Sequence, residues 1–136
     1  MKYVLNYGAF APTKAHTFDA GWDLRTPVDA VVKARDHVVI DTGVKVAIPK
    51  GYVGMLQSKS GLMIKHGIIS DGTIDSGYTG TIAVRLDNLS NEDYIFCTGD
   101  KITQLVIYPI FIDEMEEATR LTETERGENG FGSSGK

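Results

Sequence analysis

The chain has 136 residues, 42% of them hydrophobic and 24% charged, which is the composition of one globular domain large enough to bury a core. Its net charge of −4 argues against a nucleic-acid partner, because phosphate backbones are bound by broad basic surfaces. No apolar run reaches the ~20 residues that cross a bilayer, and the first residues lack signal-peptide features, so we expect a cytoplasmic protein without membrane contact.

The hydrophobic pattern predicts an all-β fold. Apolar residues occupy every second position in two segments, at Val44, Val46 and Ile48 and at positions 82, 84 and 86. This alternation predicts two strands, each with one face on a core. Further short apolar segments predict strands at 28–32, 38–40, 94–97 and 102–107. The expected separators are Thr42-Gly43, Asp71-Gly72 and Thr98-Gly99-Asp100. Together these short strands predict a sandwich or barrel-like architecture.

Helical signals are few. Ser60–His66 favours one short helix, whereas residues 113–121 have a helix-friendly composition without a clear apolar stripe.

Cys97, the single cysteine, cannot form an internal disulfide and is expected to be a small core residue. We find no repeat or linker, so residues 1–125 are expected to form one β domain that is followed by a separate segment, 126–136.

Two internal segments carry polar groups suited to phosphate chemistry. Asp23 lies between two apolar residues just after a glycine, and such an Asp is either a turn residue or a carboxylate held for a ligand. Lys59, Ser60 and Gly61 place a cation, a hydroxyl and a glycine at the expected helix start, where free N–H groups favour an anion. The alternative for Ser60 is an ordinary helix N-cap.

Two further segments carry candidate catalytic and binding groups. Asp75 and Tyr78 share a short Gly-rich loop or hairpin, where a carboxylate could act as a general base and a ring could form a pocket wall. A turn-capping Asp and a core Tyr are the alternatives. Gln104 lies among apolar residues of an expected strand, so it is either exposed by alternation or held for a ligand.

Residues 126–136 combine an arginine, an aromatic ring, two serines and several glycines. Arg126 offers a planar fork for phosphate and Phe131 a flat face for a base, while glycine lets the backbone approach an anion closely. The segment is therefore either a loose chain end or a lid.

In their order and spacing, the four segments and this tail resemble the five motifs of the trimeric dUTPase family. The most specific matches are Gly72-x-Ile74-Asp75-x-x-Tyr78-x-Gly80 and Arg126-Gly127-x-x-Gly130-Phe131-Gly132-Ser133-Ser134-Gly135. The resemblance implies a distorted jelly-roll, or β-clip, fold with at most one short helix. It also implies a homotrimer with shared active sites that hydrolyses dUTP to dUMP and pyrophosphate with Mg²⁺.

The resemblance further implies roles for single residues. Asp75 matches the carboxylate that activates the attacking water, and Asp23 and Gln104 match positions that hold the Mg²⁺–phosphate assembly through water. The residues that match substrate contacts are Lys59, Ser60, Gly61 and Gln104 for the phosphates, Gly72, Thr73 and Ile74 for the uracil edge, Tyr78 for the deoxyribose, and Arg126, Gly130, Phe131, Gly132 and Ser133 in a flexible lid.

One departure and two rival functions accompany the resemblance. The second motif usually reads Pro-Arg-Ser-Gly, but here it is Ser58-Lys59-Ser60-Gly61, so a point charge replaces a bidentate guanidinium. One rival is a dCTP deaminase of related fold. The other is a dUTP-sensing protein that switches a regulatory partner.

Overall fold

The computed structural model describes residues 1–130, and ten strands and one helix form among them. All strand pairs are antiparallel, and six strands form one curled sheet in the order β2-β10-β6-β7-β8-β4. Two smaller sheets pair β1 with β5 and β3 with β9. The elements are β1 (Tyr3–Leu5), β2 (Gly21–Arg25), β3 (Ala30–Val32), β4 (His37–Asp41), β5 (Val44–Val46), β6 (Tyr52–Gln57), α1 (Ser60–His66), β7 (Ile68–Ile74), β8 (Ala83–Asn88), β9 (Tyr94–Phe96) and β10 (Lys101–Pro109).

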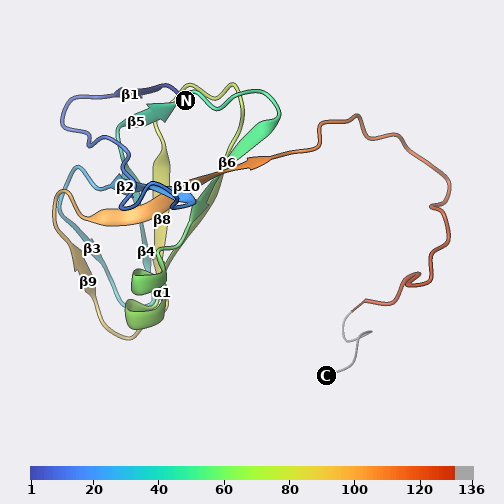
Figure 1. Ribbon diagram of the computed structural model, residues 1–136. Coiled ribbons are helices and arrows are strands. Elements are labelled where there is room, and N and C mark those ends of the chain that lie inside the picture. The colour runs from blue at the N-terminus through green and yellow to red at the C-terminus, as the bar shows by residue number, and fades with distance from the viewer. Residues whose placement is uncertain (131–136) are drawn as a thin grey trace.

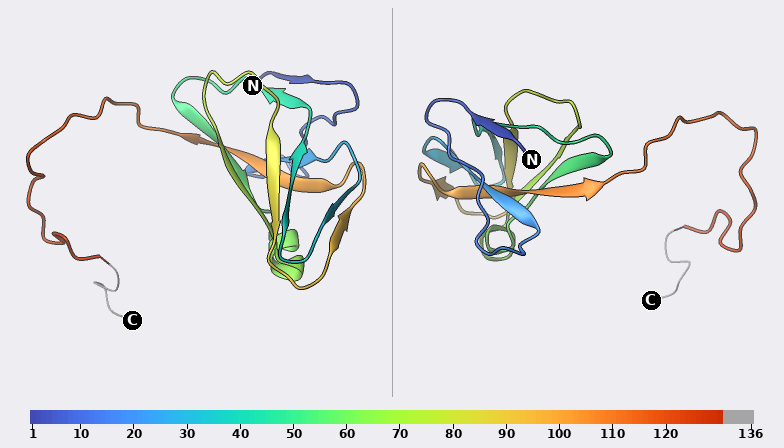
Figure 2. Two further views of the ribbon diagram at one scale, coloured as in Figure 1. Left: turned by 180° about the vertical axis from the view of Figure 1, so that it is seen from behind. Right: turned by 45° about the horizontal axis from the view of Figure 1, so that its top comes forward.

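The core side chains come from all three sheets, whose arrangement Figures 1 and 2 show. Both alternating segments contribute the side chains that their pattern predicts, with Val44, Val84 and Leu86 fully buried and Ile82 almost so. Leu24 on the edge strand β2 and Leu105 on its neighbour β10 belong to the same cluster. The predicted all-β architecture with one short helix is therefore confirmed.

The helix α1 has the predicted bounds and a well-defined C-terminal stop. Gly67 adopts the left-handed conformation at φ 66° and donates its N–H to the carbonyls of Leu62 and Met63, which satisfies the last turn. At the other end Lys59 is the N-cap, and no side chain caps the helix. Ser60 is thus the first helical residue rather than the cap, and among residues 1–130 its hydroxyl has no hydrogen-bond partner.

Two predictions about the strands are wrong. Cys97 is exposed, because β9 ends one residue earlier, at Phe96. The Phe96 ring is buried in the core. The backbone N–H of Cys97 donates to the Asp100 carboxylate in the turn that follows. Asp71-Gly72 does not separate two strands but lies inside β7, where Asp71 pairs with Gln57 of β6. The pairing partner β6 holds these two residues in the ladder against their low strand propensity.

After β10 the described chain runs away from the β body as an extended arm, residues 110–130, which is visible in Figures 1 and 2. Every residue of the arm is exposed, and residues 113–121 form no helix. The predicted lid residues Phe131, Gly132 and Ser133 lie outside the described residues. Within residues 1–130, no helix is long and apolar enough to span a membrane.

Candidate active site

The Asp75 carboxylate stands at the end of β7, in the first turn after the strand. The carbonyl of Asp75 accepts the N–H of Tyr78 at 3.2 Å, and Gly77 supplies the positive φ of 91° that this turn requires. The carboxylate itself is exposed and has no hydrogen-bond or ion-pair partner among residues 1–130. The carboxylate is therefore accessible to a ligand or a water molecule in the adjoining solvent.

Beside Asp75 lies a hollow of about 240 Å³, open to solvent. The Tyr78 ring forms one wall, and its hydroxyl donates to the Thr81 carbonyl at 2.9 Å, which fixes the ring. Gly80 lies directly beneath this ring, since a Cβ on Gly80 would approach the ring carbon Cζ to 2.5 Å. The residues that line the hollow are Thr73, Ile74, Asp75, Tyr78, Thr81 and Ala83.

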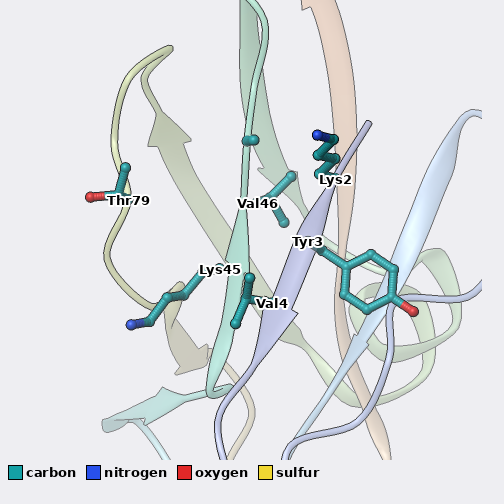
Figure 3. A pocket seen from close by; sticks show the side chains of 7 residues that line it. Lys2, Tyr3, Val4, Lys45, Val46 and Thr79 are labelled. Carbon is teal, nitrogen blue, oxygen red and sulfur yellow. The ribbon is translucent and has the colours of Figure 1, made fainter.

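A different hollow, of about 160 Å³, lies over the pair β1–β5 and contains none of the predicted site residues. Figure 3 shows Tyr3 and Val4 of β1 beside Lys45 and Val46 of β5. Thr79, from the loop that carries Tyr78, completes its rim.

Asp23 is buried in the middle of β2 and is bound by two lysines. Nζ of Lys59 lies 2.5 Å from Oδ1, and Nζ of Lys101 lies 2.6 Å from Oδ2. Burial raises the pKa of Asp23, but the hydrogen bonds from Lys101 and Lys59 outweigh burial, so the pKa lies below its ordinary value. Asp23 is therefore ionised at neutral pH and is not a turn residue.

Gln104 lies opposite Asp23, on the strand next to the edge strand β2. Its strand β10 pairs on both sides, so Gln104 faces Asp23 on β2 and Gln57 on β6. Its amide donates to the Ser58 carbonyl at 3.3 Å, just before Lys59. Gly21 makes room for this side chain, since a Cβ there would lie 2.9 Å from Oε1. Gln104 is thus held in place by its neighbours rather than turned freely to solvent.

A buried hydroxyl network supports the segment that carries Lys59. Ser58 donates its hydroxyl to the Ser70 carbonyl at 3.0 Å and accepts the Ser70 N–H at 2.9 Å. The Ser70 hydroxyl lies 2.8 Å from that of Thr103, which donates to the Gln57 carbonyl at 3.1 Å. These bonds tie the residue before Lys59 to β7 and β10.

The predicted site residues form two separate groups within one chain. Asp23, Gln104 and the Lys59-Ser60-Gly61 segment come together at one end of the β6–β7 pair, where Gln57 faces Asp71. The residues expected to bind the base, with Asp75, lie at the other end, where Gly54 faces Ile74. Gly72 lies between the groups, in the middle of β7. One chain alone therefore does not bring Asp75 and the Lys59-Ser60-Gly61 segment together.

The described part of the tail joins neither group in its own chain. Arg126 bonds locally, through Nε to the Asn129 carbonyl at 3.1 Å, and Gly130 is exposed. Both lie on the arm that leaves the β body in Figures 1 and 2.

Sequence reasoning missed Lys101, the second cation on Asp23, and the hydroxyls of Ser70 and Thr103. No local signal identifies them, because their partners lie far away in sequence: Asp23 for Lys101, and each other for Ser70 and Thr103. In the sequence, Lys101 stands three positions before Gln104, where a basic residue is typical of the solvent-exposed start of a strand.

A metal would find few direct ligands on this chain. Among residues 1–130, no three His, Cys, Asp or Glu side chains gather in one place, and both oxygens of Asp23 already accept hydrogen bonds from lysine. Mg²⁺ commonly keeps several waters and binds one or two carboxylates together with substrate phosphates. The donors Asp23 and Gln104 fit a magnesium ion of that kind, held chiefly by phosphate and water.

Comparison with known proteins identifies the family of this chain. The family model described as dUTPase matches residues 8–135. The deoxyuridine 5'-triphosphate nucleotidohydrolase of Clostridium novyi (strain NT) is 44% identical over 133 residues, which cover 96% of this chain and 94% of the relative. The enzyme of the same name from Anaplasma marginale (strain St. Maries) is 41% identical, covering 99% of this chain and 95% of its own.

Solved structures agree in fold. The Staphylococcus bacteriophage 80alpha dUTPase with dUpNHpp superposes with a TM-score of 0.92 at 32% identity, covering 98% of this chain and 97% of its own. A mutant dUTPase of phage phi11 of S. aureus, described as revealing the coordination of a structural Mg(II) ion, gives 0.81 at 30% identity, covering 88% and 96%. This likeness confirms the distorted jelly-roll fold, and with the sequence matches it shows that the chain belongs to the dUTPase family.

Proposed function

We propose that this protein hydrolyses dUTP to dUMP and pyrophosphate. The observation that carries the proposal is the Asp75 carboxylate, which is exposed, without a partner among residues 1–130, and placed at the hollow walled by Tyr78. Family membership supplies the substrate, because the curated relatives are named for dUTP hydrolysis. The same reaction would limit uracil incorporation into DNA and would supply dUMP for thymidylate synthesis.

In the proposed reaction, Asp75 accepts a proton from a water molecule whose oxygen attacks the α-phosphorus. The bond from the α-phosphorus to the oxygen that bridges to the β-phosphate breaks, and pyrophosphate leaves on the side opposite the water. An oriented carboxylate contributes to such a reaction in two ways: it positions the water, and it takes its proton as the bond to phosphorus forms.

The strand end before Asp75 would select the base. The backbone around Thr73 and Ile74 presents a donor and an acceptor to the uracil edge, and cytosine reverses both groups, which leaves buried polar atoms unpaired at roughly 1–3 kcal/mol each. Tyr78 would pack on the deoxyribose where a ribose hydroxyl would stand. The fixed position of the ring, held by the hydrogen bond to Thr81, supports this role.

Lys59, Ser60, Gly61 and Gln104 would bind the triphosphate, with Arg126 and the tail closing over it. The free Ser60 hydroxyl, which caps no helix, supports a contact to phosphate. Mg²⁺, when bound near Asp23 and Gln104, would neutralise phosphate charge and orient the leaving group. The chain's own part is to hold these donors in place, which stabilises the charge that develops on the phosphates.

We further propose that the working unit is a homotrimer whose active sites are shared between subunits, with residues 126–136 serving as the lid. The separation of Asp75 from the Lys59 segment in one chain supports shared sites, because a second copy is then needed to complete each one. The exposed arm, which leaves the β body, supports a tail that reaches another subunit.

A pyrophosphate-release assay over dUTP, dCTP, dTTP and UTP, with and without Mg²⁺, tests the proposal. We expect release from dUTP only, and only with the metal. Ammonia from dCTP would instead indicate a deaminase. Comparable rates on several nucleotides would contradict the base selection, and no release from any of them would overturn the proposed function.

A further inference from the structure

The cluster around Asp23 carries more positive than negative charge. Asp23 is a single carboxylate with a 9% exposed side chain, and both of its oxygens are bound by ammonium groups, from Lys59 and from Lys101. The two lysine side chains remain 26% and 33% exposed. Two ammonium groups on one carboxylate leave a net charge of +1. Both lysine side chains are partly exposed, and Lys59 is next to Ser60 in the chain, so this charge is accessible from solvent there.

No other acidic group of the described chain cancels this excess. Asp100, the acidic neighbour of Lys101, uses its carboxylate to accept the Cys97 N–H at 2.8 Å and forms no ion pair with a lysine. Arg25, which faces Lys101 across β2 and β10, donates to the Gly99 carbonyl at 2.7 Å. It adds positive charge nearby and removes none.

We propose that Lys101 is a positioning residue for the triphosphate: by neutralising Asp23, it leaves the charge of Lys59 available to the phosphates. This inference rests on the proposed function. Without Lys101, the cluster would contain one carboxylate and one ammonium group, and Lys59 would be neutralised by Asp23. A phosphate would then have to compete with a largely buried carboxylate for the same ammonium group.

The first test is Lys101→Met, which keeps the apolar stem and removes the charge. We expect the KM for dUTP and the Kd for a non-hydrolysable imido analogue of dUTP to rise roughly 10- to 100-fold, the effect of losing a hydrogen bond to a charged group, with kcat little changed. Lys101→Arg should restore both values. Lys33→Met is the matched control, because it removes the lysine of an exposed pair with Asp93 at 2.7 Å, beside the separate two-stranded sheet β3–β9.

The second test is compensation by Asp23→Asn, measured with the analogue in metal-free buffer so that metal binding does not contribute. If Lys101 acts by neutralising Asp23, the double variant Asp23→Asn/Lys101→Met should regain an affinity within about threefold of the wild type, since Lys59 is free again. A merely structural role predicts the opposite, because the double variant would bind no better than Lys101→Met.

The outcomes separate the two levels of the proposal. If the wild-type protein does not hydrolyse dUTP, the proposed function fails. If it does, but Lys101→Met binds the analogue normally or Asp23→Asn gives no compensation, only the role of Lys101 fails. If circular dichroism shows that Lys101→Met does not fold, the single variant Asp23→Asn decides the question. An affinity for the imido analogue in metal-free buffer that equals or exceeds that of the wild type supports the role of Lys101. A weaker affinity overturns it.

Discussion

Lys59 and Asp75 lie beyond opposite ends of the β6–β7 pair. The register sets Gln57 against Asp71 at one end and Gly54 against Ile74 at the other. These ends are three residues, or ~10 Å, apart along the strands. The register therefore separates Lys59 from Asp75 of the same chain along the strand direction.

The first prediction is that two inactive variants restore activity when mixed. Asp75→Asn should lack the base and Lys59→Met the phosphate contact, yet a trimer of both contains sites with an intact Asp75 from one chain and an intact Lys59 from another. After co-refolding at equal amounts, about one quarter of the sites should be intact in both positions. The measurement is pyrophosphate release by the mixture, with unmixed variants as controls; no recovery would contradict shared sites.

Asp75→Asn alone is the second prediction. The amide keeps the size of the carboxylate but cannot take a proton, so kcat should fall by roughly 10²- to 10⁴-fold. Because the carboxylate has no partner among residues 1–130, its loss should leave the fold and the Kd for the imido analogue nearly unchanged. Single-turnover kinetics and calorimetric binding measure the two effects separately, and turnover equal to the wild type would rule out Asp75 as the base.

Gly80 gives the third prediction. An alanine there places its Cβ within 2.5 Å of Cζ of Tyr78, so the ring must leave its wall of the hollow. We expect Gly80→Ala to raise the KM for dUTP and to weaken the preference for dUTP over UTP. Tyr78→Phe is the matched variant, since it keeps the ring and loses only the hydrogen bond to Thr81. Unchanged selectivity in Gly80→Ala, with the ring shown to have moved, would remove Tyr78 from sugar recognition.

Much of the fold could be predicted from local pattern. Alternation identified the buried faces around Val44 and Val84, and composition identified the helix Ser60–His66. Local pattern failed where pairing with a distant strand overrides propensity. Asp71-Gly72 resembles a turn, but β6 pairs with it along its length and makes it strand.

In the candidate site, too, local pattern predicts some features, whereas others depend on contacts between distant strands. Motif spacing predicted Asp75, Lys59 and Gln104 as site residues, because each belongs to a short recognisable segment. It did not show that Asp23 is bound by Lys101, which lies 78 positions further along the chain and meets it only when β2 pairs with β10. Long-range polar contacts of this kind depend on strand register, and one sequence does not define the register of distant strands.

The fourth prediction concerns the tail. Deletion of residues 126–136 removes Arg126 and the predicted lid but leaves every strand of the β body in place. We expect kcat/KM for dUTP to fall by more than tenfold, as for the loss of a charged phosphate contact, while the thermal midpoint and the oligomeric mass stay unchanged. Light scattering and a melting curve supply the controls. Full activity in the truncated protein would exclude a lid function for the segment.

The fifth prediction concerns the buried hydroxyl pair Ser70–Thr103. Thr103→Val keeps the shape of the side chain but leaves the Ser70 hydroxyl and the Gln57 carbonyl without this partner, so unfolding should be easier by about 1–3 kcal/mol. Adding Ser70→Ala removes one of the unsatisfied groups, so the double variant should lose less than the sum of the single losses. Urea unfolding of the two single variants and the double variant measures this coupling. Additive losses would show that the two hydroxyls do not support each other, and the segment before Lys59 would then depend on Ser58 alone.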